Sequence, residues 1–168
     1  MSELSRANIV IKILFIIYLL LLIKVLLFKY PFSVIVNRFS LDYSWEIILN
    51  NSNFIPFKTI NLFLFEANDV HNSVKNLLGN IIVFVPFGFL LPMVFSRLTK
   101  FLSVIFLSFA ISLLFEVTQL LFRLGSFDVD DLILNTAGSG IGFLLFRLFK
   151  PHTSIVKDST STKEGRKS

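Results

Sequence analysis

Four long apolar runs constrain what this chain can fold into more than any other feature. Each approaches the roughly 20 residues with which an α-helix crosses about 30 Å of hydrocarbon, and they cover residues 9–28, 77–95, 101–122 and 132–149. Because a bilayer offers no water to a free backbone N–H or C=O group, such segments are expected to be helical. The sequence predicts an all-α, polytopic protein of the cell membrane with about four transmembrane helices, forming one domain over residues 1–150.

Composition agrees with this assignment. Of the 168 residues 54% are hydrophobic and 21 are phenylalanine, which is more apolar surface than a soluble core of this size would bury. The first run is longer than the apolar region of a cleavable signal peptide and no A-x-A-like site follows it, so we interpret it as a retained anchor. Cysteine is absent, which excludes disulfides, thiolate catalysis and Cys-ligated metal sites.

Basic residues predict the orientation of the helices. With an even number of spans both termini share a side, and most of the bases fall on that side or in the turn between the second and third runs. By the positive-inside rule the N-terminus and the C-terminus are predicted to be cytoplasmic. The loop 29–76 and the short turn 123–131 are then extracytoplasmic.

The net charge of +5 does not indicate a nucleic-acid partner, because the bases flank the apolar runs or lie in the tail. Their expected partners are anionic membrane lipids. The tail, residues 151–168, is basic and rich in Ser and Thr, a composition that cannot bury a core. It is predicted to be disordered and cytoplasmic.

The extracytoplasmic loop has apolar patches at 32–36 and 60–65 that are too short to span a bilayer. Together with Trp45, Tyr30 and Tyr43 they predict segments lying at the membrane interface, with a re-entrant element as the alternative.

Polar residues recur at the predicted outer ends of the last three helices. In the third helix Glu116, Gln119 and Arg123 are spaced i, i+3, i+7 and share one face. An ionised group at a helix centre in the bilayer costs roughly 3 kcal/mol, so intramembrane Glu116 indicates a functional site. We predict one outward ligand-binding pocket formed by Asn76, Asn80, Glu116, Gln119, Arg123, Asp128, Asp130, Asp131 and Asn135.

Structural roles compete with this prediction. The amides of the second helix would also serve as interhelical hydrogen bonds, and Glu116 would also pair with Arg123. Asp130 or Asp131 is a plausible N-cap of the fourth helix. No cofactor and no metal site is predicted, since His71, expected in a solvated loop, has no second His at ligand spacing.

Two further features concern helix packing. Asn135, Gly138 and Gly142 form a face with a small-xxx-small pattern, which predicts close helix association and offers a surface for a homo-oligomer. Pro86 and Pro92 each remove a helical N–H from the second helix, which predicts a kinked and partly unwound segment.

Three motifs occurring in order are similar to those of the VanZ-like family of small bacterial membrane proteins: N-F-I-P-F-K-T-I at 53–60, N-L-L-G-N-I-I-V-F-V-P-F-G-F-L-L-P at 76–92, and E-V-T-Q-L-L-F-R-L-G-S-F-D-V-D-D-L-I-L-N-T-A-G at 116–138. The resemblance implies a cell-envelope protein, since the family takes its name from a member that confers low-level resistance to teicoplanin, a glycopeptide. It carries no settled catalytic mechanism. The family positions map onto Asn53, Pro56, Phe57, Asn76, Asn80, Pro86, Gly88, Pro92, Glu116, Gln119, Arg123, Asp128, Asp131, Asn135 and Gly138.

Three functions remain open from the sequence. The first is an envelope protein whose outward pocket binds a lipid head group, a wall precursor or a glycopeptide, with Arg123 contacting phosphate or carboxylate. The second is a metal-dependent hydrolase or transferase acting on a lipid-linked substrate, for which Glu116, Asp128 and Asp131 are the catalytic candidates. The third is a transporter or an accessory subunit of a larger complex.

Overall fold

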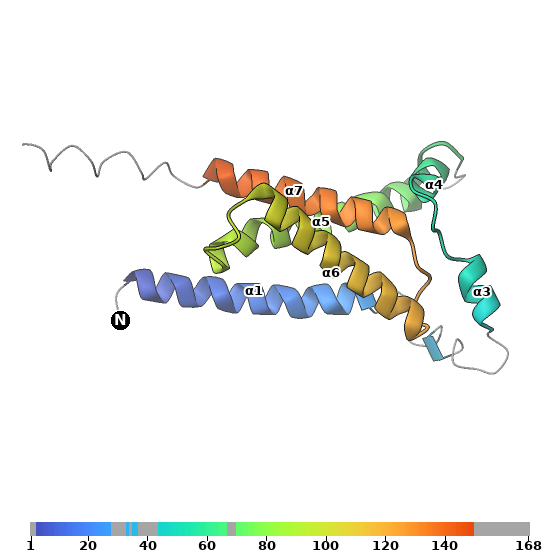
Figure 1. Ribbon diagram of the computed structural model, residues 1–168, viewed down its shortest axis with the longest axis horizontal. Coiled ribbons are helices and arrows are strands. Elements are labelled where there is room, and N and C mark those ends of the chain that lie inside the picture. The colour runs from blue at the N-terminus through green and yellow to red at the C-terminus, as the bar shows by residue number, and fades with distance from the viewer. Residues whose placement is uncertain (1–2, 28–32, 34, 37–43, 67–69, 150–168) are drawn as a thin grey trace, which may run out of the picture.

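Four long helices run lengthwise and alternate in direction (Figure 1). The computed structural model describes residues 3–27, 33, 35–36, 44–66 and 70–149. Each long helix contains a stretch long and apolar enough to cross a membrane, which confirms the predicted all-α, multi-pass membrane fold. The helices are α1 (Glu3–Leu27), α5 (Val70–Val94), α6 (Phe101–Leu121) and α7 (Val129–Phe149).

The helices are longer at some ends than the apolar runs that predicted them. Hydropathy marks only the part of a helix that crosses hydrocarbon, whereas backbone hydrogen bonding continues into the interface. Helix α5 therefore begins at Val70 rather than at 77. His71, expected in a loop, belongs to its first turn. The predicted tail, residues 151–168, lies outside the described residues.

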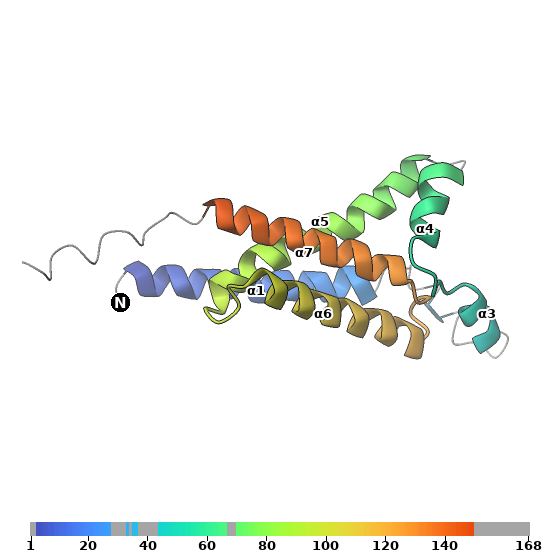
Figure 2. The ribbon, with the colours of Figure 1, turned by 45° about the horizontal axis from the view of Figure 1, so that its top comes forward.

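Three short elements lie across one end of the bundle, opposite the end at which α1 begins (Figures 1 and 2). They are α3 (Trp45–Asn50), α4 (Lys58–Asn61) and the π-helical turn η1 (Leu62–Glu66). Apolar side chains on them are exposed, Phe65 by 80%. This placement suits the interfacial segment predicted for 60–65, whereas Tyr30, Tyr43 and positions 32 and 34 of the patch 32–36 lie outside the described residues.

Helices α5 and α7 form the most extensive contact in the bundle. A Cβ atom added at Gly138 would lie 2.1 Å from the carbonyl oxygen of Ile81, and one at Gly142 would lie 2.0 Å from that of Val85. From the other side, a Cβ at Gly88 would lie 1.9 Å from the carbonyl oxygen of Ser139. The glycine face predicted from the sequence thus brings two backbones into direct contact, as small residues do in membrane helices.

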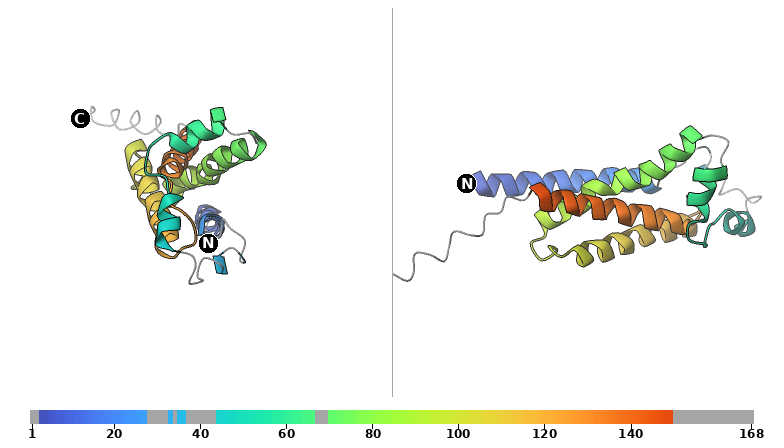
Figure 3. Two further views of the ribbon diagram at one scale, coloured as in Figure 1. Left: turned by 90° about the vertical axis from the view of Figure 1, so that its right-hand side faces the viewer. Right: turned by 90° about the horizontal axis from the view of Figure 1, so that it is seen from above.

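Helix α7 packs on both α5 and α6, and α1 packs on α5 and α6 through larger side chains (Figure 3). Phe15 and Leu22 of α1 join a core that includes Phe84, Phe87 and Phe143. Most other side chains of α1 at positions 8–27 are exposed apolar groups, which suits a lipid-facing helix.

Helix α5 stays helical through Pro86 and Pro92, so the predicted unwinding is wrong. Side chains of neighbouring helices reach its backbone close to the first proline. The Tyr18 hydroxyl donates to the carbonyl oxygen of Val83 at 2.8 Å, and the Ser139 hydroxyl donates to that of Phe84 at 3.4 Å. The segment is thus in contact with α1 and α7, and tertiary packing keeps it in the helical form that local chemistry disfavours.

Candidate functional site

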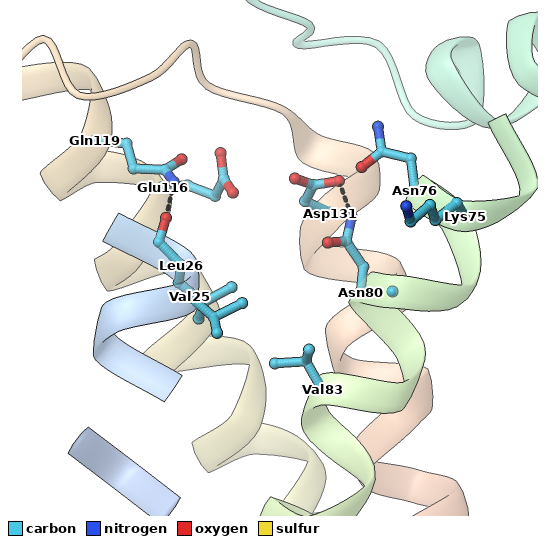
Figure 4. A pocket seen from close by; sticks show the side chains of 10 residues that line it. Val25, Leu26, Lys75, Asn76, Asn80, Val83, Glu116, Gln119 and Asp131 are labelled. Atoms are coloured by element: carbon cyan, nitrogen blue, oxygen red, sulfur yellow. Dashed lines mark hydrogen bonds between the residues drawn. The ribbon is translucent and has the colours of Figure 1, made fainter. Parts of the chain in front are cut away.

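A cavity of about 170 Å³ opens between the helices at the end that carries α3 and α4 (Figure 4). We call it the polar cavity. Its polar lining residues are Lys75, Asn76, Asn80, Glu116, Gln119 and Asp131. Its remaining lining residues are Val25, Leu26, Gly79 and Val83. Helices α5, α6 and α7 thus bring together five of the nine residues predicted to form a pocket, and the last turn of α1 supplies an apolar wall.

Glu116 and Gln119 reach the cavity from the last turns of α6. Both are almost fully buried, with exposed fractions of 4% and 5%. Glu116 Oε2 accepts the backbone N–H of Asp128 at 2.9 Å, and Gln119 Nε2 donates to the carbonyl oxygen of Leu26 (Figure 4). Glu116 therefore holds the turn after α6, and Gln119 holds the end of α1.

Asn80 and Asp131 meet across the contact between α5 and α7. The Asn80 side-chain amide donates to Asp131 Oδ1 (Figure 4). Because the amide nitrogen faces the carboxylate, the amide oxygen of Asn80 is turned toward the cavity. The pair combines the predicted interhelical role of Asn80 with a position in the cavity lining.

Asp130 serves the first loop rather than the cavity. It is fully buried, with an exposed fraction of 0%. Its two carboxylate oxygens accept the backbone N–H groups of Phe57 and Ile60, the latter at 3.0 Å. These N–H groups belong to the start of α4, whose N-cap, Phe57, has a positive φ of 67°. Asp130 thus supplies acceptors for donors that a helix start leaves unpaired.

Asp128 is the cap of α7, where the sequence suggested Asp130 or Asp131. Its Oδ1 accepts the backbone N–H of Asp130 at 2.9 Å and the Asn53 side-chain amide at 3.0 Å. The backbone of Asn53 also pairs with the turn, donating to Phe127 at 2.7 Å and accepting from Val129 at 2.9 Å. The first loop is therefore joined to the turn between α6 and α7.

Arg123 lies at the end of α6 and is not among the lining residues of the cavity. Its φ of 54° is left-handed, and it follows a C-cap at which Leu124 N–H returns to the carbonyl oxygen of Gln119 at 2.9 Å. Its guanidinium carbon lies 4.7 Å from the centroid of the Trp45 ring. This cation–π contact joins α6 to α3 at the interface.

Asn135 lies deeper, between α6 and α7, and is also not a lining residue. It is 2% exposed, and its amide donates to the Ser112 hydroxyl at 2.8 Å. Its Oδ1 has no hydrogen-bond partner within the described part of the chain. The structure thus assigns Asn135 a position in the helix contact below the cavity.

The carboxylates do not gather around a common point. Within the described ranges, no group of three or more His, Cys, Asp or Glu side chains is arranged to hold a metal ion. Asp128 and Asp130 accept hydrogen bonds in the loop, while Glu116 and Asp131 line the cavity from different helices.

Sequence reasoning did not identify several residues of this site. Lys75 falls within the predicted loop 29–76, whereas the structure places it on α5 beside Asn76. Gln119 bonds to the backbone carbonyl oxygen of Leu26. Every residue has such a carbonyl, so the sequence could not identify Leu26 as the partner. Gly79 could have been found from its place on the α5 face that carries Asn76, Asn80 and Val83.

Comparisons with known proteins give a consistent result. A family model described as VanZ/LLP1 matches residues 15–150. The chain is 35% identical over 103 residues to Protein VanZ of Enterococcus faecium, an alignment that covers 60% of each chain. The chain thus spans about 60% of the length of this curated relative. No solved structure matches.

Proposed function

The chain belongs to the VanZ/LLP1 family, and from that premise we propose that it is a cell-envelope membrane protein whose polar cavity binds the polar part of an amphiphilic envelope molecule. The candidate ligands are a lipid head group, a lipid-linked wall precursor and a glycopeptide. In this proposal the cavity end faces outward and both termini are cytoplasmic, as the distribution of bases indicates.

The observation on which the proposal depends is that the cavity lining has a polar part and an apolar part. Amide and carboxylate groups come from the ends of three helices, while Val25, Leu26 and Val83 form an apolar wall lower in the bundle (Figure 4). A site that is largely apolar with a few convergent polar groups is typical of small-molecule binding. The two kinds of lining match a molecule with a polar head and an apolar body.

The burial of the polar groups supports the same proposal. Glu116 is 4% exposed within a span that must otherwise face lipid or protein. Ionisable residues in spans are costly and usually mark binding sites or pathways. Its contact with the N–H of Asp128 also couples the cavity to the outer turn.

The metal-dependent hydrolase is not favoured by the geometry. One of its three catalytic candidates, Asp128, accepts the backbone N–H of Asp130 at the start of α7. The neighbouring Asp130 accepts the N–H groups of Phe57 and Ile60 in the first loop. A divalent ion would therefore compete with the contacts that shape the end of the bundle. We place binding ahead of catalysis for this reason.

The proposal is tested by antibiotic susceptibility. A susceptible Gram-positive host would express the wild type, Glu116→Gln, Asp131→Asn or the control Glu46→Gln at equal membrane levels. Glu46 lies in the first turn of α3, outside the cavity lining, and loses its carboxylate in the same way. We expect the wild type and the control to raise the inhibitory concentration of teicoplanin more than that of vancomycin, and the two cavity variants to lose the rise.

No rise with the wild type correctly inserted would argue against a role in glycopeptide resistance. An equal rise for all four proteins would show that the cavity is not the site responsible.

A further inference from the structure

We infer that the polar cavity opens sideways to the bilayer between α1 and α5, and that this opening holds the hydrocarbon chain of the bound amphiphile. This inference rests on the proposed function and adds where the apolar part of the ligand lies. The occupant is a flexible alkyl chain, such as the acyl chain of a membrane lipid, which reaches the cavity from within the membrane.

The apolar and polar lining residues of the cavity are divided between the helices. Every lining residue from α6 or α7 is polar, whereas all the apolar ones belong to α1 or α5, which is polar only toward its start. The apolar ones are Val25, Leu26, Gly79 and Val83. Figure 4 shows Val25 and Val83 facing the same space from α1 and α5, below the polar groups. An alkyl chain on this side would not cover polar groups and remove their partners.

Helices α1 and α5 separate at the level of the cavity. The Tyr18 hydroxyl joins them at its base, through the carbonyl oxygen of Val83. Further along α1, Leu26 is bonded to Gln119 of α6 instead. Within the described residues, no hydrogen bond joins α1 to α5 beyond Tyr18. The first half of α5 leans away from α1 (Figures 2 and 3), so polar contacts do not close this side.

The opening lies at membrane depth. Its apolar lining residues all fall within the candidate spans Asn8–Leu27 and Val74–Val94. Val25 is itself 50% exposed, and Ile82, next to Val83, is 61% exposed. The apolar lining is therefore continuous with the lipid-facing surface of both helices. An alkyl chain can enter here from the hydrocarbon without passing through water or past the polar lining.

Gly79 provides room on the α5 side of the opening. A Cβ atom added there would meet no atom within 4 Å, in contrast to the glycines at the contact between α5 and α7. Gly79 is also a lining residue, so this free space adjoins the cavity. A larger side chain at this position would take the place that we assign to the alkyl chain.

The experiment maps the position of a chain on the full protein in bilayer nanodiscs of phosphatidylcholine. The probe is lysophosphatidylglycerol with a photoreactive diazirine midway along its single acyl chain, and labelled residues would be identified by peptide mass spectrometry. We expect the label on Val25, Leu26 and Val83 to exceed that on Phe106, which is 74% exposed on α6, by about tenfold. Lysophosphatidylglycerol without the diazirine should compete with the first label and not with the second, because only a binding site saturates.

Variants test whether the label marks the opening. Gly79→Leu should lower the label on the three lining residues about tenfold and leave the label on Phe106 unchanged. Its melting temperature should not fall, because glycine is a poor helix former and the new side chain enters open space. Gly79→Ala should lower the label less. Ala110→Leu is the matched control, since it enlarges an exposed residue of α6 outside the cavity lining.

The outcomes separate the inference from the function on which it rests. Saturable label on α3, α4 or Lys75 in place of the three lining residues would overturn the inference and leave amphiphile binding in place. Label on the lining residues that Gly79→Leu does not change would also overturn the inference, because the probe would then reach them without using the opening. Label that saturates at no residue would overturn it as well, whereas the susceptibility test decides the proposed function separately.

Discussion

Two helix contacts in this bundle are built in different ways. Helix α7 meets α5 backbone to backbone, because Gly138, Gly142 and Gly88 leave no side chain between them. Helix α1 meets the bundle through large side chains such as Phe15, and through hydrogen bonds at Tyr18 and Leu26. A contact between side chains can adjust by rotamer changes, but a contact between backbones cannot. The difference indicates that α5 and α7 form the rigid part of the polar cavity and α1 its adjustable wall.

The largest loss of stability is expected at the contact between the backbones of α5 and α7. Gly138→Ala would place a methyl group where only 2.1 Å separates the Cβ position from the Ile81 carbonyl oxygen, so α5 and α7 must move apart. We expect a loss of about 3 kcal/mol in the free energy of unfolding. Reversible unfolding of the purified protein in mixed detergent micelles would measure this loss.

Gly140→Ala is the matched control for that change. Its Cβ would lie 3.3 Å from the end of the flexible Ile105 side chain, so a small effect is expected. Similar losses for the two variants would contradict the contrast between backbone and side-chain contacts.

An intermediate loss of stability is expected at Asp130, where the first loop is attached to α7. Asp130→Ala removes the acceptors of the Phe57 and Ile60 N–H groups, at a cost of about 2 kcal/mol for the two donors. Asp130→Asn, which keeps one carbonyl oxygen, should fall between the wild type and the alanine variant. Hydrogen exchange at Phe57 and Ile60 should rise in step with the loss of stability. Unchanged exchange there would mean that the loop does not depend on α7.

The smallest loss of stability is expected at the contact between α1 and α6. Gln119→Leu removes the hydrogen bond to the Leu26 carbonyl oxygen, and such bonds in membrane bundles average about 0.6 kcal/mol. Exchange of amides in the last turn of α1 should become faster, while the amides of α7 should keep their wild-type rates. A comparable acceleration in α7 would show that α1 is as firmly attached as the rest of the bundle.

The sequence was sufficient for those features that depend on local pattern. Hydropathy alone located the four spans, and the spacing of Gly138 and Gly142 predicted the close contact of α7. The meeting of Asn80, Glu116 and Asp131 followed from placing them at the same ends of their helices.

Other features depend on contacts between distant parts of the chain and could not be predicted. Asp130 bonds to backbone groups of α4, and which of three neighbouring aspartates does so is set by the loop path. Arg123 was predicted to line the pocket, whereas the C-cap geometry after α6 places its guanidinium over Trp45, outside the cavity lining. The unwinding expected at Pro86 was wrong because packing against α1 and α7 outweighs a local preference.

The attachment of the first loop to Asp130 has a consequence for how the protein is made. Phe57 precedes Asp130 by 73 residues, which is roughly 4 to 15 seconds of synthesis at about 5 to 20 residues per second. During that interval α4 lacks the acceptors for its first N–H groups, although α1, the described span that precedes it, has already been made. The cavity end is therefore completed only after the start of α7 has been made, by which time α1, α5 and α6 have already been synthesised.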